Sequence, residues 1–223
     1  MNILVIPSLN PPESFYSFVS EISRNDCFAK IIIIDDGSSQ KEIFRKINDN
    51  LTIQIITNNK NRGKGYSIKK SINYILKNKI KTNGVIFADC DGQHSVKDIL
   101  KLNKLMNEDP KSFYIGKRVI SSSNMPLMNF IGNYLSSNLF KFITKKNVSD
   151  INNGLRGIPF NLLHKFLNSN HTKFSYEIHI LKKILQHDIV IKELEIETIY
   201  QKNYSTNFKK ISDSIKIIWS IIF

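Results

Sequence analysis

The chain has 223 residues and a mass of 25.8 kDa, which suits one α/β domain and leaves no room for a second large one. Its 41% hydrophobic and 23% charged residues are typical of a globular protein with a core, and they exclude a disordered chain. The two cysteines, Cys27 and Cys90, exclude a disulfide framework and favour a reducing, cytoplasmic location.

The net charge of +13 and the pI near 9.6 need a physical reason. Nucleic acid, an anionic membrane face and a phosphorylated substrate are all suitable partners for a basic protein. A composition rich in lysine, asparagine and isoleucine is the alternative explanation, since the lysines are scattered along the chain. The sequence contains no zinc-ligand spacing, no RNA-binding motif and no basic stripe interleaved with aromatic residues, so we exclude nucleic acid as a partner.

The first half of the chain alternates between apolar runs and amphipathic segments. The apolar runs predict strands at residues 2–6, 30–34, 51–56, 84–88 and 113–116. Apolar residues at helical spacing predict helices between these strands, at residues 13–24, around 43–47, up to about 77 and around 99–105. Strands that alternate with helices in this way predict a mainly parallel, Rossmann-like α/β sheet with helices on both faces, in a single domain.

The regular alternation ends after residue 118. We expect a loop at residues 119–125, a helix at 127–142, a polar turn at 150–157, a helix around 176–181 and an edge strand at 189–198. We predict that residues 1–208 form the domain and that residues 209–223 form an amphipathic helix. Because that helix would combine lysines, isoleucines and Trp219, it suits either the interface of a cytoplasmic membrane or packing on the core.

Polar clusters follow four of the predicted strands, at residues 7–10, 35–38, 89–93 and 116–118. The carboxyl ends of parallel strands meet at one edge of a sheet, and ligands of α/β proteins gather there. The sequence therefore predicts one ligand site at this edge.

Two carboxylates stand one residue apart in the cluster at 89–93. Gly92 lets the chain bend so that Asp89 and Asp91 reach the same side, with Gln93 as a further oxygen ligand. Hard oxygen ligands suit Mg²⁺ or Mn²⁺, and such a metal would neutralise a departing diphosphate. Cys90 would point away from its neighbours, which argues against a nucleophilic thiol.

The other clusters supply candidates for ligand contact. Asp36, at the end of the second strand, can accept hydrogen bonds from a ribose or a base, while Ser38 is expected to cap the next helix. Arg118 is suited to grip a diphosphate. Lys64, between two glycines, matches neither a P-loop nor a dinucleotide motif.

Taken in order, these motifs resemble the family 2 glycosyltransferases of the GT-A fold, and within them the dolichyl- and polyprenyl-phosphate sugar synthases. The matching segments are residues 6–10 (IPSLN), 34–38 (IDDGS), 61–65 (NRGKG), 89–94 (DCDGQH), 116–118 (GKR) and 150–156 (DINNGLR). The order and spacing of the six segments make the resemblance specific, and it covers nearly the whole chain.

The resemblance implies an inverting glycosyltransferase that takes a hexose from a nucleotide-diphosphate sugar, UDP- or GDP-linked. It implies a metal bound by Asp89, Asp91 and Gln93. The implied nucleotide-sugar contacts are Pro7, Leu9, Asn10, Asp35, Asp36, Lys64, Asp89, Cys90, Asp91, Arg118 and Arg156. Leu9 and Pro11 stand where the synthases usually have Tyr and Glu, which leaves the nucleotide open.

Two acceptors remain open. A polyprenyl phosphate is already an anion and needs no general base, whereas a glycan hydroxyl needs a carboxylate opposite the leaving group. The candidates for that base are Asp150 and Glu177, which complete a predicted catalytic set with Asp91 and Arg118. The resemblance favours the lipid phosphate, with the glycan hydroxyl as the alternative.

Overall fold

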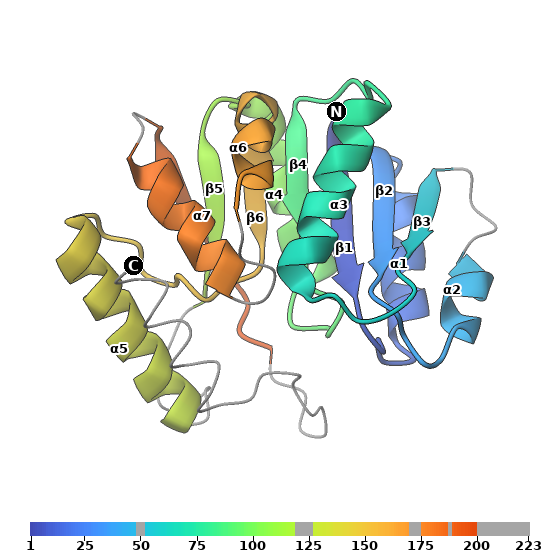
Figure 1. Cartoon of the computed structure of the whole chain (residues 1–223), viewed down its shortest axis with the longest axis horizontal. Coiled ribbons are helices and arrows are strands. Elements are labelled where there is room, and N and C mark those ends of the chain that lie inside the picture. Colours follow the sequence, from blue (N-terminus) through green and yellow to red (C-terminus); the bar gives the residue numbers. More distant parts are fainter. Residues whose placement is uncertain (48–51, 119–126, 170–174, 187–188, 200–223) are drawn as a thin grey trace.

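The computed structural model describes residues 1–47, 52–118, 127–169, 175–186 and 189–199. Seven strands form one sheet in the order β3-β2-β1-β4-β6-β5-β7 (Figure 1). The strands are β1 (Asn2–Ser8), β2 (Phe28–Asp35), β3 (Ile53–Thr57), β4 (Gly84–Phe87), β5 (Phe113–Arg118), β6 (Arg156–Pro159) and β7 (Ile191–Ile196). Neighbouring pairs are parallel except at β6, which runs antiparallel to both β4 and β5. The predicted, mainly parallel α/β sheet is confirmed.

Helices cover both faces of this sheet, as expected. One face carries α1 (Phe15–Arg24), α2 (Glu42–Ile47) and α4 (Val96–Glu108), and the other carries α3 (Lys64–Lys77), α6 (Leu163–Leu167) and α7 (Ser175–Leu185), with η1 (Phe160–Leu162) leading into α6. The apolar strands contribute side chains to the hydrophobic core on both faces of the sheet, because successive side chains of a strand point to opposite faces. In β1, for example, Ile3 and Val5 pack on the α3 side, and Leu4 and Ile6 pack on the α1 side.

The sequence pattern does not predict strand β6, because it indicates a turn over the whole of residues 150–157. In the structure the turn ends at residue 155, and the strand begins at Arg156. Four residues that include Gly157 and Pro159 carry no alternation of polar and apolar side chains, so the sequence gives no strand signal. Gly157 instead permits close packing, since a Cβ there would lie 3.1 Å from Met106 Sδ and 3.3 Å from Tyr114 Cβ.

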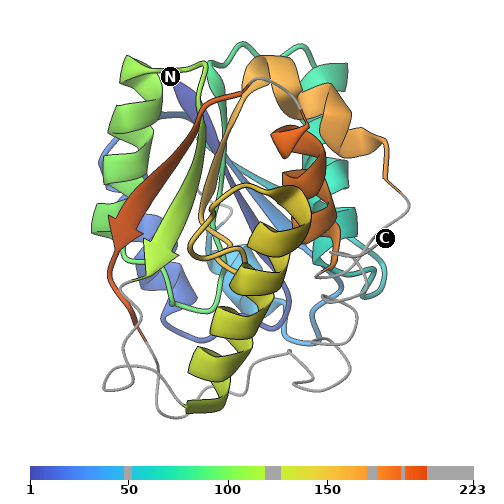
Figure 2. The same ribbon diagram turned by 90° about the vertical axis from the view of Figure 1, so that its left-hand side faces the viewer.

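Helix α5 (Leu127–Thr144) begins at the predicted residue and extends past the carboxyl ends of the strands (Figure 2). The predicted edge strand at 189–198 is β7, which pairs only with β5 among the described strands. The predicted loop at 119–125 and the predicted helix at 209–223 lie outside the described residues. Within the described part of the chain, no helix is long and apolar enough to cross a membrane.

Candidate functional site

Strands β1, β2, β4 and β5 all end at the same edge of the sheet, so the polar clusters predicted to form a site do lie along one edge. Hydrogen bonds join the first two clusters directly. The Asn10 backbone N–H donates to Ser38 Oγ at 2.9 Å, and Asn10 Oδ1 accepts from the Ser39 backbone N–H at 2.9 Å. The edge is therefore a connected surface and not a row of separate loops.

An ion-pair network lies at the centre of this edge. Lys64 Nζ, in the first turn of α3, lies 2.5 Å from Asp89 Oδ1 at the end of β4 and 3.0 Å from Glu177 Oε2 on α7. All three side chains are mostly buried, with exposed fractions of 14% for Lys64, 27% for Asp89 and 11% for Glu177. One lysine thus joins two carboxylates that lie far apart in the sequence.

The network changes the charge states of its members. Burial alone would lower the pKa of Lys64, but the charges of Asp89 and Glu177 outweigh it and raise that pKa well above its ordinary value. Burial would likewise raise the pKa of Asp89, but Lys64 and His94 outweigh it and lower that pKa far below its ordinary value. Lys64 and Asp89 are therefore both charged across the physiological pH range.

Asp91 has a different environment. Its Oδ1 accepts a hydrogen bond from the Gln93 backbone N–H at 3.0 Å, and burial followed by the negative charge of Asp89 raises its pKa. His94 Nε2 lies 3.4 Å from Asp89 Oδ2. The negative charges of Asp89 and Asp91 repel each other, and a bound divalent cation would reduce this repulsion.

The residues present fit a metal that is bound partly by its substrate. Asp89, Asp91 and Gln93, the predicted metal ligands, carry hard oxygen donors within one short segment of the chain. Among the described residues, no group of three or more His, Cys, Asp or Glu side chains forms a ready-made metal site. In Mg²⁺ sites of proteins, one or two carboxylates are commonly completed by substrate phosphates and water.

Asp36 organises the loop that leads to Lys64. Its Oδ1 accepts from Asn58 Nδ2 at 2.7 Å and from the Arg62 backbone N–H at 3.0 Å, and its Oδ2 accepts from the Gly63 backbone N–H at 2.7 Å. Gly63 adopts a positive φ of 93° directly before α3. Both carboxylate oxygens of Asp36 thus have partners within the chain, so a contact with the nucleotide would be additional to these.

The turn after β2 depends on two neighbours of Asp36. Asp35 Oδ1 accepts from the Ser38 backbone N–H at 2.8 Å. Gly37 has a φ of 80°, and a Cβ there would lie 2.5 Å from the carbonyl carbon of Lys60. These two residues hold the loop at 58–63 against the end of β2. The prediction that Ser38 caps the next helix is wrong, because α2 begins only at Glu42 and Ser38 Oγ accepts from the Asn10 backbone N–H instead.

Arg118 and Asp150, both predicted to be catalytic, contact each other. Arg118 Nε lies 2.7 Å from Asp150 Oδ2, and its NH2 group donates to Asp150 Oδ1 at 2.9 Å. Asp150 is fully buried, and its Oδ2 also accepts from the Arg118 backbone N–H at 3.3 Å. The bidentate pair joins the end of β5 to the turn before β6.

Arg156 lies beneath the network and not at its surface. It is 3% exposed, and its guanidinium donates to the backbone carbonyls of Asn153, Ile151 and Glu177 at 3.0, 2.9 and 2.7 Å. Burial lowers its pKa, against the opposing charges of Glu177, Asp89 and Asp150. These bonds fix the turn at 151–153 and the start of α7, so Arg156 positions Glu177.

Several predicted contacts are part of the strand ends themselves. Pro7 is buried within β1, Leu9 is half-buried and Asn10 is exposed. Burial, with the charges of Asp89 and Asp91, raises the pKa of the Cys90 thiol to about 12 in spite of hydrogen bonds to Leu9 and Ser8. The thiol is therefore protonated at neutral pH and is a poor nucleophile.

Sequence reasoning missed Gly154 as a site residue. A Cβ at this position would overlap Asp89 Oδ2 and lie 2.8 Å from Lys64 Nζ, so only glycine allows the turn to cover the ion pair. It also missed Asn58, the partner of Asp36, and Asn153, whose Nδ2 is buried without a hydrogen-bond partner. The family resemblance includes the segment at 150–156, but no local sequence pattern shows which of its residues contacts Asp89.

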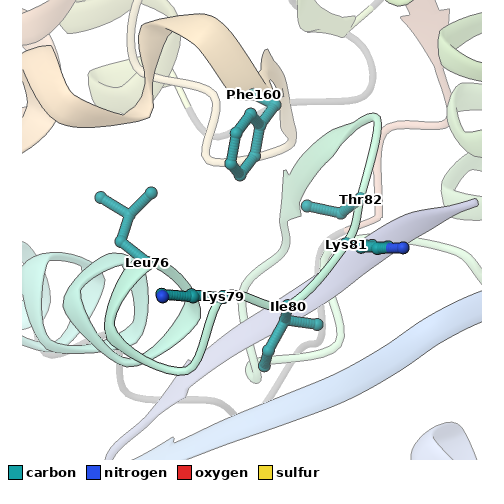
Figure 3. Close-up of a pocket in the computed structure, with 6 residues that line it drawn as sticks. All are labelled: Leu76, Lys79, Ile80, Lys81, Thr82 and Phe160. Atoms are coloured by element: carbon teal, nitrogen blue, oxygen red, sulfur yellow. The ribbon is translucent and has the colours of Figure 1, made fainter.

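A pocket of about 380 Å³ lies away from these residues (Figure 3). It is lined by Leu76, Lys79, Ile80, Lys81, Thr82 and Phe160. Because residues 79–82 lie between the end of α3 and the start of β4, the pocket is at the amino end of the strands, opposite the charged edge. Its wall lacks the carboxylates of the strand-end site.

A comparison with protein families decides how the charged edge is interpreted. The family model for glycosyl transferase family 2 matches residues 3–170, about three quarters of the chain. The chain belongs to glycosyl transferase family 2. The resemblance drawn from the six sequence segments is thereby confirmed at the level of the family.

Two archaeal relatives match this glycosyltransferase over almost its whole length. An uncharacterised protein of Methanocaldococcus jannaschii is 28% identical over 227 residues, covering 98% of this chain and 90% of the relative. The UDP-N-acetylglucosamine–dolichyl-phosphate N-acetylglucosaminyltransferase of Methanococcus voltae is 24% identical over 240 residues, covering 98% and 94%.

Solved structures show the same fold. Glucosyl-3-phosphoglycerate synthase from Mycobacterium tuberculosis, in complex with Mn²⁺, UDP and phosphoglyceric acid, superposes with a TM-score of 0.74 at 15% identity, covering 99% of this chain and 77% of that one. The complex of that enzyme with Mn²⁺, UDP-glucose and phosphoglyceric acid gives a TM-score of 0.72, also at 15% identity, covering 99% and 77%. The predicted GT-A fold is confirmed.

Proposed function

We propose that this glycosyltransferase moves a hexose from a nucleotide-diphosphate sugar to polyprenyl phosphate, with inversion and with Mg²⁺ or Mn²⁺. The observation that carries the proposal is the ion-pair network of Lys64, Asp89 and Glu177 beside Asp91, at the carboxyl edge of the sheet. The M. voltae relative is named for transfer to dolichyl phosphate, and the M. tuberculosis structures hold Mn²⁺ and UDP. Both support the proposal without assigning the substrate.

On the donor side, the chain's residues bind and neutralise the diphosphate. Asp91, with Asp89 and Gln93, would hold the metal, which would supply positive charge to the leaving diphosphate. Lys64 adds a fixed cation at the amino terminus of α3, where the helix dipole also favours anions. Asp36 fixes the loop that presents Lys64, through the Arg62 and Gly63 backbone N–H groups.

On the acceptor side, the carboxylates predicted as general bases are already paired. Asp150 is buried in a bidentate pair with Arg118, and Glu177 Oε2 is held by Lys64. Asp150 is shut off from an acceptor because it is fully buried, and Lys64 occupies one oxygen of Glu177. A phosphate acceptor needs no base, so this arrangement favours the lipid phosphate over a hydroxyl.

One observation favours the alternative acceptor, a glycan hydroxyl. Glu177 Oε1 is buried and has no hydrogen-bond partner. An acceptor hydroxyl placed there would satisfy that oxygen and lose its proton to it. Glu177 would then act as the base while Lys64 holds its other oxygen.

The two acceptors are separated by one set of assays. Purified enzyme, Mn²⁺ and labelled UDP- and GDP-hexoses are incubated with a short-chain polyprenyl phosphate or with oligosaccharide acceptors. We expect a labelled lipid product, and we expect Glu177→Gln to retain most of the rate because Gln still accepts from Lys64. If the product is an oligosaccharide and Glu177→Gln slows its formation by about 10²-fold or more, the hydroxyl acceptor is correct.

The metal site is tested in the same assay. We expect Asp91→Ala to abolish transfer and to remove the Mn²⁺ dependence of UDP binding in a thermal-shift experiment. Glu21→Ala, an exposed change on α1, is the matched carboxylate control and should behave as the wild type. Wild-type turnover by Asp91→Ala would rule out the proposed centre.

The location follows from the acceptor. A polyprenyl phosphate is found in a membrane, so the proposal includes a peripheral association with the cytoplasmic membrane face. Fractionation of cells that express the tagged chain tests this, and recovery only in the supernatant at low salt would contradict it.

A further inference from the structure

Helix α5 presents large apolar side chains to solvent. Tyr134, Leu135 and Phe142 have exposed fractions of 63%, 61% and 72%. Residues four and seven apart lie on one side of an α-helix, so Tyr134 and Leu135 share their face with Asn138 and Phe142. The exposed apolar residues therefore form one surface along the helix.

The same face is basic. Lys141, Lys145 and Lys146 are exposed at the end of α5, and Lys145 Nζ lies 4.8 Å from the centre of the Phe142 ring. The helix sequence contains neither aspartate nor glutamate. Aromatic side chains interleaved with lysines, without acidic residues, define what we call the outer face of α5.

The opposite side of α5 is anchored, which fixes the direction of the outer face. Phe140 is fully buried in the core. Ser137 Oγ donates to the Ser149 carbonyl at 3.1 Å, and Asn152 Nδ2 donates to Ser136 Oγ at 2.9 Å. These bonds join α5 to the turn that carries Asp150, so the helix is attached to the candidate site.

The helix also has a suitable place in the fold. Figures 1 and 2 show α5 at the carboxyl edge of the sheet, extending beyond the strand ends where the charged residues lie. A surface in contact with α5 would therefore lie near the edge of the sheet that carries the site.

We propose that the outer face of α5 docks the enzyme on the surface of an anionic lipid bilayer. Aromatic and aliphatic side chains enter the boundary between headgroups and acyl chains, while lysines contact the anionic headgroups. The inference rests on the proposed lipid-phosphate acceptor and deepens it, because docking through α5 brings the strand-end site to the membrane surface.

Charge complementarity favours a bilayer over a second copy of the chain. A symmetric contact between two outer faces would bring three lysines of each copy together with no acidic residue on either helix, which is unfavourable. An anionic headgroup layer attracts the same lysines.

The test measures vesicle binding directly. The full chain is sedimented with vesicles of phosphatidylcholine alone or with about 30% phosphatidylserine. We expect binding to the anionic vesicles, and a loss of about fivefold in partition coefficient per lysine removed, so about 100-fold for the triple variant Lys141→Gln, Lys145→Gln, Lys146→Gln. Leu135→Ser with Phe142→Ser should lower binding by at least about tenfold.

A matched control removes the same charge elsewhere. Lys97, Lys101 and Lys104 are exposed on α4, which covers the other face of the sheet from α3, α6 and α7. Their triple change to Gln should leave vesicle binding nearly unchanged. Equal losses in the two triple variants, or no binding by the wild type, would overturn the proposal.

Two further measurements separate the other outcomes. If sedimentation velocity shows that Phe142→Ser turns a dimer into a monomer while vesicles are not bound, the face is a contact between copies and the proposal fails. Transfer to a detergent-dispersed, short-chain polyprenyl phosphate should be equal in wild type and α5 variants, whose folding is checked by melting temperature. Absence of that transfer with intact vesicle binding would refute the proposed acceptor and leave the docking face standing.

Discussion

Lys64 Nζ and Asp89 Oδ1 lie 2.5 Å apart, and this ion pair joins the amino end of α3 to the carboxyl end of β4. Glu177 holds the same lysine from α7. The pair thus connects three separate elements at the point where the proposed metal ligands begin. Lys64 therefore compensates part of the negative charge of the acidic cluster in this glycosyltransferase, and Asp91 forms no ion pair with a lysine or arginine among the described residues.

Removing this lysine should leave two mostly buried carboxylates unpaired. We expect Lys64→Met to lower the free energy of unfolding by about 1–3 kcal/mol, below the value for a fully buried pair because Asp89 is 27% exposed. We also expect weaker UDP binding by calorimetry, since the fixed cation is lost. Urea denaturation measures the first effect.

Two comparisons make this prediction specific. Lys77→Met, an exposed change at the other end of α3, should stay within about 0.5 kcal/mol of the wild type. Adding Glu177→Met to Lys64→Met should recover part of the lost stability, because one orphaned carboxylate is removed. A double variant less stable than the sum of its parts would contradict this account.

Gly154 should tolerate no side chain. A methyl group there would overlap Asp89 and lie 2.8 Å from Lys64 Nζ, so the ion pair would have to open. We expect Gly154→Ala to destabilise the protein by about 1–3 kcal/mol and to reduce transfer strongly. Ser17→Ala, on the exposed side of α1, serves as the control; unchanged turnover in Gly154→Ala would show that the turn adapts.

Asp36→Asn tests how Lys64 is presented. The amide keeps one oxygen acceptor but places an NH₂ group against a donor, either the Gly63 N–H or those of Asn58 and Arg62. We expect about 1–3 kcal/mol of destabilisation and weaker donor binding. Asp26→Asn, on an exposed turn, controls for charge. Unchanged stability together with lost nucleotide binding would instead show that Asp36 acts mainly on the ligand.

The ion pair between Asp109 and Lys192 predicts a dependence of stability on pH. Hydrogen bonds from Lys192 and Ser112 hold the pKa of Asp109 well below its ordinary value. A carboxyl whose pKa is lowered by folding stabilises the protein above its unfolded pKa of about 3.9, and this contribution is lost as the pH falls through the folded value.

Lys192→Met should therefore be slightly less stable than the wild type at pH 7, and the difference should shrink below about pH 4. Melting temperatures at pH 7, 5 and 3 measure it, with the exposed neighbour Lys111→Met as the control. A difference that is the same at all three pH values would mean that Lys192 acts through packing on Tyr114, where its Nζ lies 6.0 Å from the ring centre.

Much of the fold was predictable because its strands are buried on both faces. A continuous apolar run, such as residues 2–6 or 30–34, is buried on both sides only in a sheet that helices cover on both faces. Both runs are strands in the structure. Strand β6 was not predictable, because its short segment with Gly157 and Pro159 becomes a strand only when β4 and β5 flank it.

The candidate site was likewise predictable only in part. Asp89, Asp91 and the strand-end clusters could be placed at one edge from the chain alone, since parallel strands end together. The partners of these residues could not be placed, because Lys64 and Glu177 approach Asp89 only after α3 and α7 pack on the sheet. The same holds for Arg118 and Asp150, which sequence reasoning treated as separate catalytic candidates.

By itself, the sequence determined the α/β architecture and the position of the polar clusters at strand ends, because hydrophobic periodicity and the succession of strands and helices are local properties of the chain. Only the tertiary structure decided which charges meet. Lys64 neutralises Asp89, Arg118 neutralises Asp150, and Arg156 is buried beneath both pairs. Such pairings depend on distances between elements far apart in the chain, and burial sets their strength.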